Sequence, residues 1–318
     1  MPQPTHGQVH IDAALTNLSV AYLQDASQFI AGRVFPMVPV DHKSDKYFTY
    51  TKGDFRRNTA KPRAAGTESA GGGFNMSTDN YSAETYALHK DVPDDIRNNA
   101  DAAVNVDADA SRFVMEQLLI QKEVQWAADN FTTGIWGTDV VGGTDFTAWG
   151  DASSDPETDI DAGKAKGLRV TGKMFNTLVV GYAVHQALKK HPLITERYKY
   201  TSSESITAEM IAAFLEIDQY WVAMASYNTA QEGAADVDSM ILGSHALLCY
   251  VTPSPGLMAV SAGYTFVWKN ASGGLNNAGV AMSTFRMQHL KSDRVEGEFT
   301  YDHKVVATDC GYFFSAAA

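Results

Sequence analysis

The segment Ala60–Asn80, AKPRAAGTESAGGGFNMSTDN, contains four glycines, three of them consecutive, close to Lys61 and Arg63. A phosphate-binding loop, a flexible linker and an arm that contacts a partner can all have this composition. The segment connects Lys46–Lys52 to Tyr81–His89, two stretches whose alternating aromatic residues and threonines are typical of strands. This pattern predicts a hairpin whose connection is far longer than the usual loop of about two to five residues.

A phosphate-binding loop is disfavoured by the residues after the glycines. Phosphate cradles place a loop between a strand and a helix, whose first N–H groups face the anion, and a Walker loop also needs Gly-Lys-Ser/Thr. Here the glycines lead into a predicted strand, and no lysine comes directly after them. An arm is favoured instead. Half of residues 46–89, fully extended, would span about 65 Å, whereas a compact body of this length has a radius of gyration of about 20 Å.

Such an arm would not be ordered alone in water, because its few contacts cannot offset the loss of conformational entropy. A neighbouring copy of the chain would order it. The basic run KGDFRRNTAKPR, Lys52–Arg63, would then dock on acidic surface of an otherwise acidic protein. The alternative is a disordered surface segment.

Residues 1–44 predict a second arm that also needs a surface to lie on. Apolar residues at helical spacing follow Asp12, which suits a helix cap. They are Leu15, Leu18, Tyr22, Phe29 and Ile30. Pro36 and Pro39 then force an extended path.

The clearest predicted helix runs from Asp107 to Asn130, which at ~1.5 Å per residue makes a rod ~35 Å long. Its packed face is expected to consist of Phe113, Gln117, Ile120, Val124, Ala127 and Phe131. Residues 132–172 are rich in Gly, Asp and Thr and are expected to form mostly loops. Within them, the acidic run Asp151–Asp161 fits a solvated loop. A weak cation site is the alternative, although Ile160 stands where a calcium loop needs glycine.

From about residue 175 to 285 the pattern predicts a compact body of mixed helices and strands. A strand running into a helix is expected over Asn176–Pro192, a helix over Thr207–Ile217, and strands within Tyr220–Asn228, Ser239–Val251 and Tyr264–Asn270. Near the end of the chain, Val295, Phe299 and Tyr301 alternate with charged residues. This alternation predicts a long, half-exposed strand.

The composition excludes several classes of protein. The chain has 318 residues and a formal net charge of −12, which argues against a protein that grips DNA or an anionic membrane. No stretch approaches the ~20 apolar residues of a membrane span, and the first residues lack the pattern of a signal peptide. Cys249 and Cys310 lie in apolar, strand-like sequence, which favours buried thiols over a disulfide or a nucleophile.

No motif predicts catalytic, cofactor-binding or metal-binding residues. His185 and His191 are six residues apart on one predicted helix and therefore do not share a face. Ser244 lacks the glycine two positions later that a nucleophile elbow needs. The chain is expected not to be an enzyme. A hydrolase without a visible motif is the rival from another class.

Three stretches resemble a known family: RVFPMVPVDHKSDKYFTYTKGDFRR (33–57), KPRAAGTESAGGGF (61–74) and ALHKDVPDDIRNNAD (87–101). Together with the order of predicted elements, they resemble the major capsid proteins of tailed phages. The resemblance implies an α+β, Hong Kong 97-type capsid fold. Its parts would be an N-terminal arm (1–44), an extended loop (45–90), a peripheral domain with a spine helix (91–174 and 286–318) and an axial domain (175–285).

The resemblance also implies a function and partners. Identical subunits would assemble in the cytoplasm of a host bacterium into an icosahedral shell, the virion capsid, around double-stranded DNA, without a membrane. Expected contacts between subunits are Phe55, Arg56, Arg57, Lys61, Arg63, Phe74, Phe35 and Pro36. The short N-terminal arm implies a separate scaffolding protein. A portal is also expected, and a decoration protein is a further candidate partner.

The resemblance leaves two points open. Some family members cross-link a loop lysine to a neighbour's asparagine with the help of a glutamate. Lys52 and Lys61 lie in the corresponding loop, but neither partner residue can be matched. An encapsulin, a bacterial compartment that loads an enzyme, is the rival on the same fold. The long glycine-rich loop favours a phage shell over an encapsulin, whose loop tends to be shorter.

Overall fold

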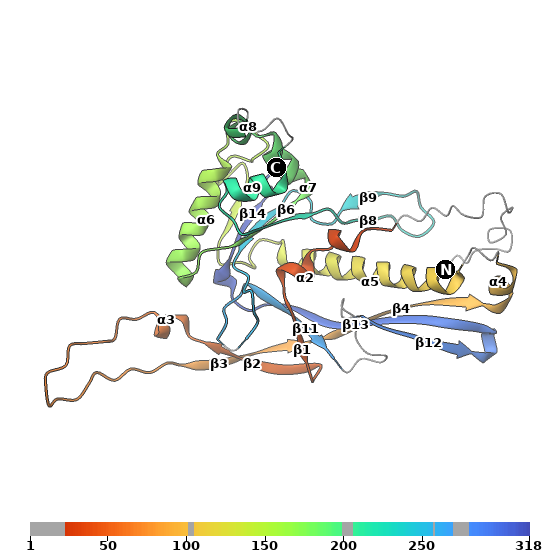
Figure 1. Cartoon of the computed structure of the whole chain (residues 1–318), viewed down its shortest axis with the longest axis horizontal. Helices are drawn as coiled ribbons and strands as arrows, with labels where there is room; N and C mark the ends of the chain where they lie inside the picture. Colours follow the sequence, from red (N-terminus) through yellow and green to blue (C-terminus); the bar gives the residue numbers. More distant parts are fainter. Residues whose placement is uncertain (1–22, 101–104, 199–205, 257, 270–279) are drawn as a thin grey trace.

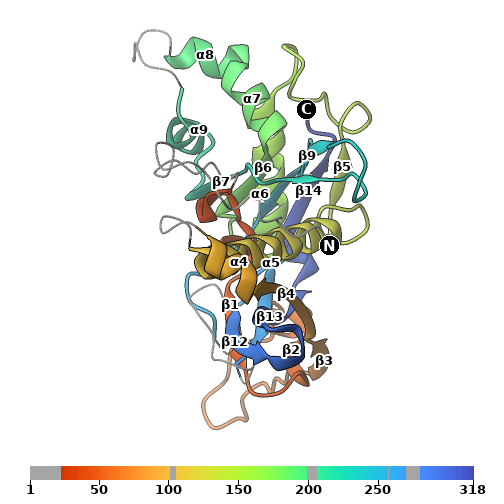
Figure 2. The same ribbon diagram turned by 90° about the vertical axis from the view of Figure 1, so that its right-hand side faces the viewer.

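The computed structural model describes residues 23–100, 105–198, 206–256, 258–269 and 280–318. The longest helix among them, α5, Val106–Asn130, lies between two units (Figure 1). A sheet covers one side of α5, a unit of sheet and helices lies towards the other, and a hairpin projects beyond both (Figures 1 and 2). Helices and strands are mixed, and the expected α+β class is confirmed. None of the described helices is long and apolar enough to cross a membrane.

The first sheet is built around β13, Ser292–Val305. One edge of β13 pairs antiparallel with β4, Glu84–Pro93, which runs into the short helix α4, Asp94–Asn99. The other edge pairs first with β12, Ala281–Met287, and then with β11, Gly263–Trp268. The sheet is completed by β1, Met37–Val40, which runs parallel to β11.

The strand β13 is the long, half-exposed strand that the sequence predicts, with Phe299 among its buried residues. Val114 and Leu118 of α5 pack on Phe299. The helix can approach this closely because β13 has glycine at 297. A Cβ atom there would lie 2.7 Å from Cγ1 of Val114 and 2.8 Å from Cδ1 of Leu118. Gly297 therefore sets the distance between helix and sheet.

The bounds of α5 agree with the prediction, but its packed face agrees only in part: Ala127 and Phe131 are buried as expected, whereas Phe113 and Gln117 are exposed. The buried side chains are those of Ala110, Val114, Leu118, Lys122, Glu123, Trp126, Ala127 and Asn130. Phe113, expected on the packed face, is 45% exposed. The sequence pattern misleads here because a lysine and a glutamate lie on the buried face while a phenylalanine lies on the exposed one.

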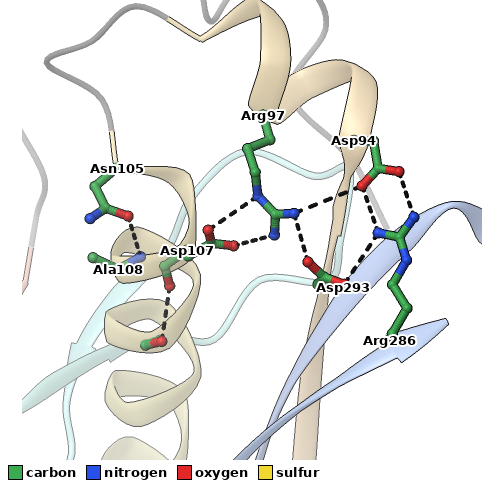
Figure 3. Close-up of polar contacts among 8 residues, drawn as sticks. Asp94, Arg97, Asn105, Asp107, Ala108, Arg286 and Asp293 are labelled. Atoms are coloured by element: carbon green, nitrogen blue, oxygen red, sulfur yellow. Dashed lines mark hydrogen bonds and ion pairs between the residues drawn. The ribbon is translucent and has the colours of Figure 1, made fainter.

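An ion cluster holds one end of the first sheet together (Figure 3). Arg97 of α4 donates to Asp107 in the first turn of α5 and to Asp293 of β13, both at 2.6 Å. Arg286 of β12 donates to Asp94 at 2.5 and 2.6 Å and to Asp293 at 3.2 Å. The hydrogen bond from Arg286 holds the pKa of Asp94 below its usual value, and that from Arg97 does the same for the pKa of Asp293. The cluster joins α4, α5, β12 and β13.

The second sheet has the strand order β5-β14-β10-β6-β7. Its strands are β5 (Asp139–Val141), β14 (Gly311–Ser315), β10 (Ala246–Cys249), β6 (Thr177–Gly181) and β7 (Gln219–Ala223), and its helices are α6 (Pro156–Thr171), α7 (Tyr182–Lys190), α8 (Pro192–Tyr198) and α9 (Ala208–Phe214). The predicted strand-to-helix step, β6 to α7, and the predicted helix α9 are confirmed. A small hairpin of β8, Ser226–Asn228, and β9, Asp238–Met240, lies beside α5 (Figure 1).

The prediction of a solvated acidic loop at Asp151–Asp161 was wrong, because much of this run is the start of α6. Asp155 caps the helix and accepts a hydrogen bond from the N–H of Thr158 at 3.1 Å. Glu157 and Asp159 then lie in the first turn, where the helix dipole favours negative charge. In the described part of the chain, no group of three or more His, Cys, Asp or Glu could hold a metal ion.

Strand pairing divides the chain differently from the expected boundaries. β11 falls in the expected axial segment, 175–285, and β12 crosses the end of that segment, but both strands pair with β13 of the first sheet. β5 and β14 fall in the expected peripheral segments but belong to the second sheet, and α6 packs on β10 and β14. We therefore propose a division by sheet, with 306–310 as one link between the two units.

The described part of the N-terminal arm lies on its own chain. Asp12, Leu15, Leu18 and Tyr22 fall outside the described residues. Phe29 and Ile30 do not continue a helix, but lie between the turn η2, Ala26–Gln28, and the short helix α2, Ala31–Val34. The N–H groups of Ile30 and Ala31 donate to the buried Glu123 carboxylate at 3.1 and 3.0 Å. The extended path predicted from the prolines is confirmed as β1.

The two cysteines are free and buried, as predicted. Burial raises the pKa of both thiols, that of Cys310 to about 12.

Candidate functional site

The projecting hairpin consists of β2, Ser44–Tyr50, paired antiparallel with β3, Met76–Ser82. The strand expected at Tyr81–His89 is therefore split: β3 ends at Ser82, and β4 continues on β13. The predicted hairpin with a very long connection is confirmed. The connection begins with the short helix α3, Lys52–Phe55, and residues 56–75 contain no further helix or strand.

The root of the hairpin is fixed to the first sheet by aromatic stacking. The ring of Tyr81 stacks on Phe266 of β11 with centroids 4.5 Å apart, and the ring of Tyr47 lies 5.6 Å from Phe266. The Tyr47 hydroxyl donates to Asp79 at 2.8 Å. The two strands therefore leave the body from a packed base.

Beyond the strands, two contacts close the neck of the loop. The N–H of Thr51 donates to the carbonyl of Asn75 at 3.2 Å. The carboxylate of Asp54 accepts from the backbone and side-chain amides of Asn75 at 2.9 and 3.0 Å. We call residues 57–73, which lie beyond this neck, the loop tip; Figure 1 shows the loop extending away from both sheets.

An exposed aromatic cluster lies at the neck. The ring centroids of Phe55 and Phe74 are 5.2 Å apart, and both rings contact Tyr50 at 5.8 and 6.0 Å. Phe55 remains 50% exposed and Phe74 60%. Clustered, exposed aromatic side chains are typical of surfaces that bind a partner.

The loop tip carries three of the expected contact cations, Arg57, Lys61 and Arg63, and every residue from 56 to 75 is exposed. Arg57 lies 3.8 Å from Asp54, but its side chain is 71% exposed. Lys61 and Arg63 form no ion pair with the described residues. These charges are therefore available to a partner.

Lys52 and Arg56 contact their own chain instead. Lys52 forms an ion pair with Asp309. The Arg56 guanidinium donates to the carbonyls of Val170 and of Arg169, the latter at 3.0 Å, at the end of α6. No sequence motif links these residues, because they are brought together only by the fold. Arg56 was expected to contact a neighbour, and the structure gives it an intrachain role.

The structure also corrects the expectation for Phe35. This side chain has no exposed surface, and its ring lies 5.9 Å from Trp126 and 6.5 Å from Trp136. A fully buried side chain offers nothing to a neighbouring subunit, so we remove Phe35 from the set of proposed contacts. Pro36 is half-buried, and its carbonyl accepts from Thr265 at 3.1 Å.

The glycines have two different roles. The chain turns at Gly66, whose φ of +80° favours glycine, and the N–H of Thr67 donates to the carbonyl of Ala64 at 3.2 Å. The three glycines 71–73 have no such φ. A Cβ at Gly71 or Gly73 would meet nothing within 4 Å. Their own chain therefore does not require glycine at these positions.

Among the described residues, one buried serine lies in contact with a histidine. This contact does not support the rival prediction of a hydrolase. The Ser154 hydroxyl lies 3.0 Å from Nε2 of His191 and donates to the carbonyl of Asp151 at 2.7 Å. Both side chains are buried. This serine is turned towards the backbone and closed to a substrate.

Comparisons with known proteins agree on the fold. No family model matches the chain. A phage-related protein from Bordetella bronchiseptica superposes with a TM-score of 0.70 over 92% of this chain and 94% of its own, at 24% identity. The capsid of cyanophage P-SCSP1u gives a TM-score of 0.58 over 94% and 90%, at 12% identity. The SrpI encapsulin of Synechococcus elongatus gives 0.58 over 96% and 95%, also at 12%.

The chain has the Hong Kong 97-type capsid fold. In sequence, it is 24% identical over 314 residues to the major capsid protein of Burkholderia phage BcepMu, covering 96% of both chains. The resemblance to tailed-phage major capsid proteins is thus confirmed. In the terms of this fold, α5 is the spine helix and the projecting hairpin is the extended loop.

Proposed function

We propose that this chain is a structural shell protein, the major capsid protein of a tailed phage, and that its copies assemble into an icosahedral shell around double-stranded DNA. The observation that carries the proposal is the loop. It extends away from its own body and presents an exposed aromatic pair, Phe55 and Phe74, and three cations, Arg57, Lys61 and Arg63. Such a surface supports binding to another copy of the chain.

Charge also supports a neighbouring copy as the partner. Five of the chain's cations lie between Lys52 and Arg63, where the sole acid is Asp54, so the rest of the chain is more acidic than the net charge of −12 suggests. A basic tip on one subunit and an acidic surface on the next attract each other. The same acidic balance suits a container that does not hold its DNA tightly.

The relationship to the BcepMu capsid protein favours a phage shell over an encapsulin. The fold alone does not separate the two, because phage capsids and an encapsulin superpose equally well on the chain. By analogy with tailed phages, the proposed partners are a scaffolding protein, a portal and a decoration protein, and the proposed place of assembly is the host cytoplasm.

The test is the assembly state of the purified protein, alone and with a candidate scaffolding protein. A shell of at least sixty copies of 34.5 kDa has a mass of about 2 MDa and elutes at the void volume of a gel-filtration column. Electron microscopy should show closed particles. A monomer or dimer under all of these conditions would contradict the proposal. Nucleic acid in particles from infected cells supports a phage shell, whereas an enzyme cargo would identify an encapsulin.

The loop has its own test. Replacing the tip, 57–73, with a short Gly-Ser linker should leave a folded subunit that no longer closes shells, because the tip contacts other subunits rather than its own body. Circular dichroism and thermal unfolding are the controls for folding. Normal shells from this variant would refute the assigned role of the tip.

A further inference from the structure

At the base of the extended loop, two cations, Lys52 and Arg56, contact their own chain, whereas docking residues would face a neighbouring subunit. Arg56 donates to the carbonyls of Arg169 and Val170, in the last turn of α6. These carbonyls lack partners within the helix, and the negative end of the helix dipole favours a cation there. The helix then ends at Gly172 in the left-handed conformation, with φ +74°. Arg56 thus joins the loop to the second unit.

Lys52 makes the other contact, to Asp309. Asp309 lies in the turn η4, Thr308–Cys310, between β13 of the first sheet and β14 of the second. The partner of Lys52 is therefore on the link between the two units. The hairpin root, meanwhile, stacks on Phe266 of the first sheet. The base of the loop is attached to the first sheet, to the link and to the second unit.

We propose that Lys52 and Arg56 act as positioning residues: together they form a joint that fixes the direction of the loop tip relative to both units. The inference rests on the proposed function, since the direction of the tip matters when a neighbouring copy receives it. Arg57, Lys61 and Arg63 make no comparable contacts and are the docking charges. The loop's cations thus divide into two classes by position.

Geometry explains why such a joint matters. Residues 57–66 lead from the neck to the turn at Gly66, and ten extended residues span about 30 Å. A rotation of about 20° at the base would therefore displace the turn by about 10 Å. The Lys52–Asp309 pair is about half exposed and weak alone, so the joint depends on both contacts acting together.

The joint can be tested on free subunits by measuring distances between two spin labels with double electron–electron resonance. One label is placed on the tip at Ala65→Cys. The second is placed either on α6 at Ala165→Cys or on β4 at Ala87→Cys; all three positions are exposed. The native Cys249 and Cys310 are buried and should not react.

The decisive variant is Lys52→Met/Arg56→Met, and its matched control is Arg57→Met/Lys61→Met, which removes the same charge from the same loop. If the joint holds the tip, Lys52→Met/Arg56→Met should give a distance distribution about twice as wide as that of the labelled protein with Lys52 and Arg56 in place. The joint predicts an unchanged distribution for the control. The proposal would be overturned if neither variant broadens the distance distribution, or if both variants broaden it by the same amount.

A charge swap distinguishes a specific pair from a general loss of structure. Lys52→Asp broadens the distribution, and Lys52→Asp/Asp309→Lys narrows it again if the ion pair is the contact that matters. A swap that fails to narrow it, in a variant whose unfolding curve is unchanged, contradicts the role of Lys52. All of these measurements use unassembled subunits. The joint can therefore fail while shells still form, and shells can fail to form while the joint is confirmed.

Discussion

Replacing both exposed phenylalanines of the loop, Phe55→Ala/Phe74→Ala, should weaken assembly far more than it weakens the subunit. A phenylalanine side chain buries roughly 150–250 Å² when fully covered. Since Phe55 is 50% and Phe74 60% exposed, together they offer about 200 Å² to a neighbour. Alanine would retain a small part of this area.

At about 25 cal/mol per Å², removing most of this apolar area costs about 3–4 kcal/mol of association free energy per subunit. With tenfold in concentration for every 1.4 kcal/mol, the critical concentration for shell formation should rise by about 140- to 700-fold. The free subunit should lose the contacts that the two exposed rings make with each other and with Tyr50, and a single aromatic pair contributes about 0.5–1.5 kcal/mol.

The assay is light scattering or gel filtration across a series of protein concentrations, with chemical unfolding of the free subunit measured in parallel. Phe55→Leu/Phe74→Leu, which keeps most of the apolar area, is the matched control and should shift the critical concentration much less. An unchanged critical concentration for the alanine variant would refute the aromatic cluster as a contact between subunits. A large loss of subunit stability would refute the separation between folding and assembly.

The other predictions concern the body of the subunit and the exposure of its loop. Gly297→Ala should destabilise the subunit by about 1–3 kcal/mol, because its Cβ would lie 2.7 Å from Val114; Gly73→Ala, with open space around it, is the control, and equal denaturation midpoints would contradict this packing. Arg97→Met should lower stability by about 1 kcal/mol, because it removes the hub of the ion cluster. Arg97 lowers the pKa of Asp293, so the loss should fade below about pH 4 as Asp293 protonates; a loss independent of pH would contradict the charge argument. Burial raises the pKa of Glu123 from 4.5 to about 7, so the folded chain binds the extra proton between these values and stability falls as the pH rises through this window. Glu123→Gln should therefore lose less stability than the wild type between pH 5 and 7, and parallel pH profiles would contradict this. Trypsin should cut free subunits after Arg63 and should cut assembled shells much more slowly; equal rates would show that the tip is not covered by a neighbour.

Elements with a strong local pattern could be predicted from the sequence. The spine helix, the step from β6 to α7, the helix α9 and the alternation in β13 all depend on residues near one another in the chain. The hairpin was also predictable, because alternating aromatic residues and threonines mark stretches on both sides of the glycine-rich connection. The register of the hairpin could not be predicted. Its second strand begins at Met76 rather than Tyr81, because the residues of β4 pair with β13 instead.

The packed face of α5 and the role of the acidic run could not be decided locally. The buried Glu123 is explained by the two backbone N–H groups of residues 30 and 31, which lie far away in sequence. The acids at Glu157 and Asp159 suit a loop and a helix start equally well, and the packing of Ile160 in the core of the second unit decides between them.

In the candidate site, the sequence predicted an aromatic and basic surface on the loop. It did not predict which of the loop's cations would contact their own chain. The aromatic and basic residues of the loop stand out by composition, and Phe74, Arg57, Lys61 and Arg63 are exposed as a contact requires. Nothing near Lys52 or Arg56 indicates Asp309 or the end of α6, which are 257 and 113 residues away. Phe35, by contrast, stands in an apolar stretch that suits an arm on a neighbour as well as a core.

A cryo-electron-microscopy reconstruction of assembled particles would show directly whether the loop joins one subunit to the next. We expect closed icosahedral shells in which the tip, 57–73, of every subunit lies against another copy, with Phe55 and Phe74 covered. Particles in which the tip stays exposed to solvent, or preparations without closed particles, would contradict the assignment of this chain as a shell protein held together by its loop.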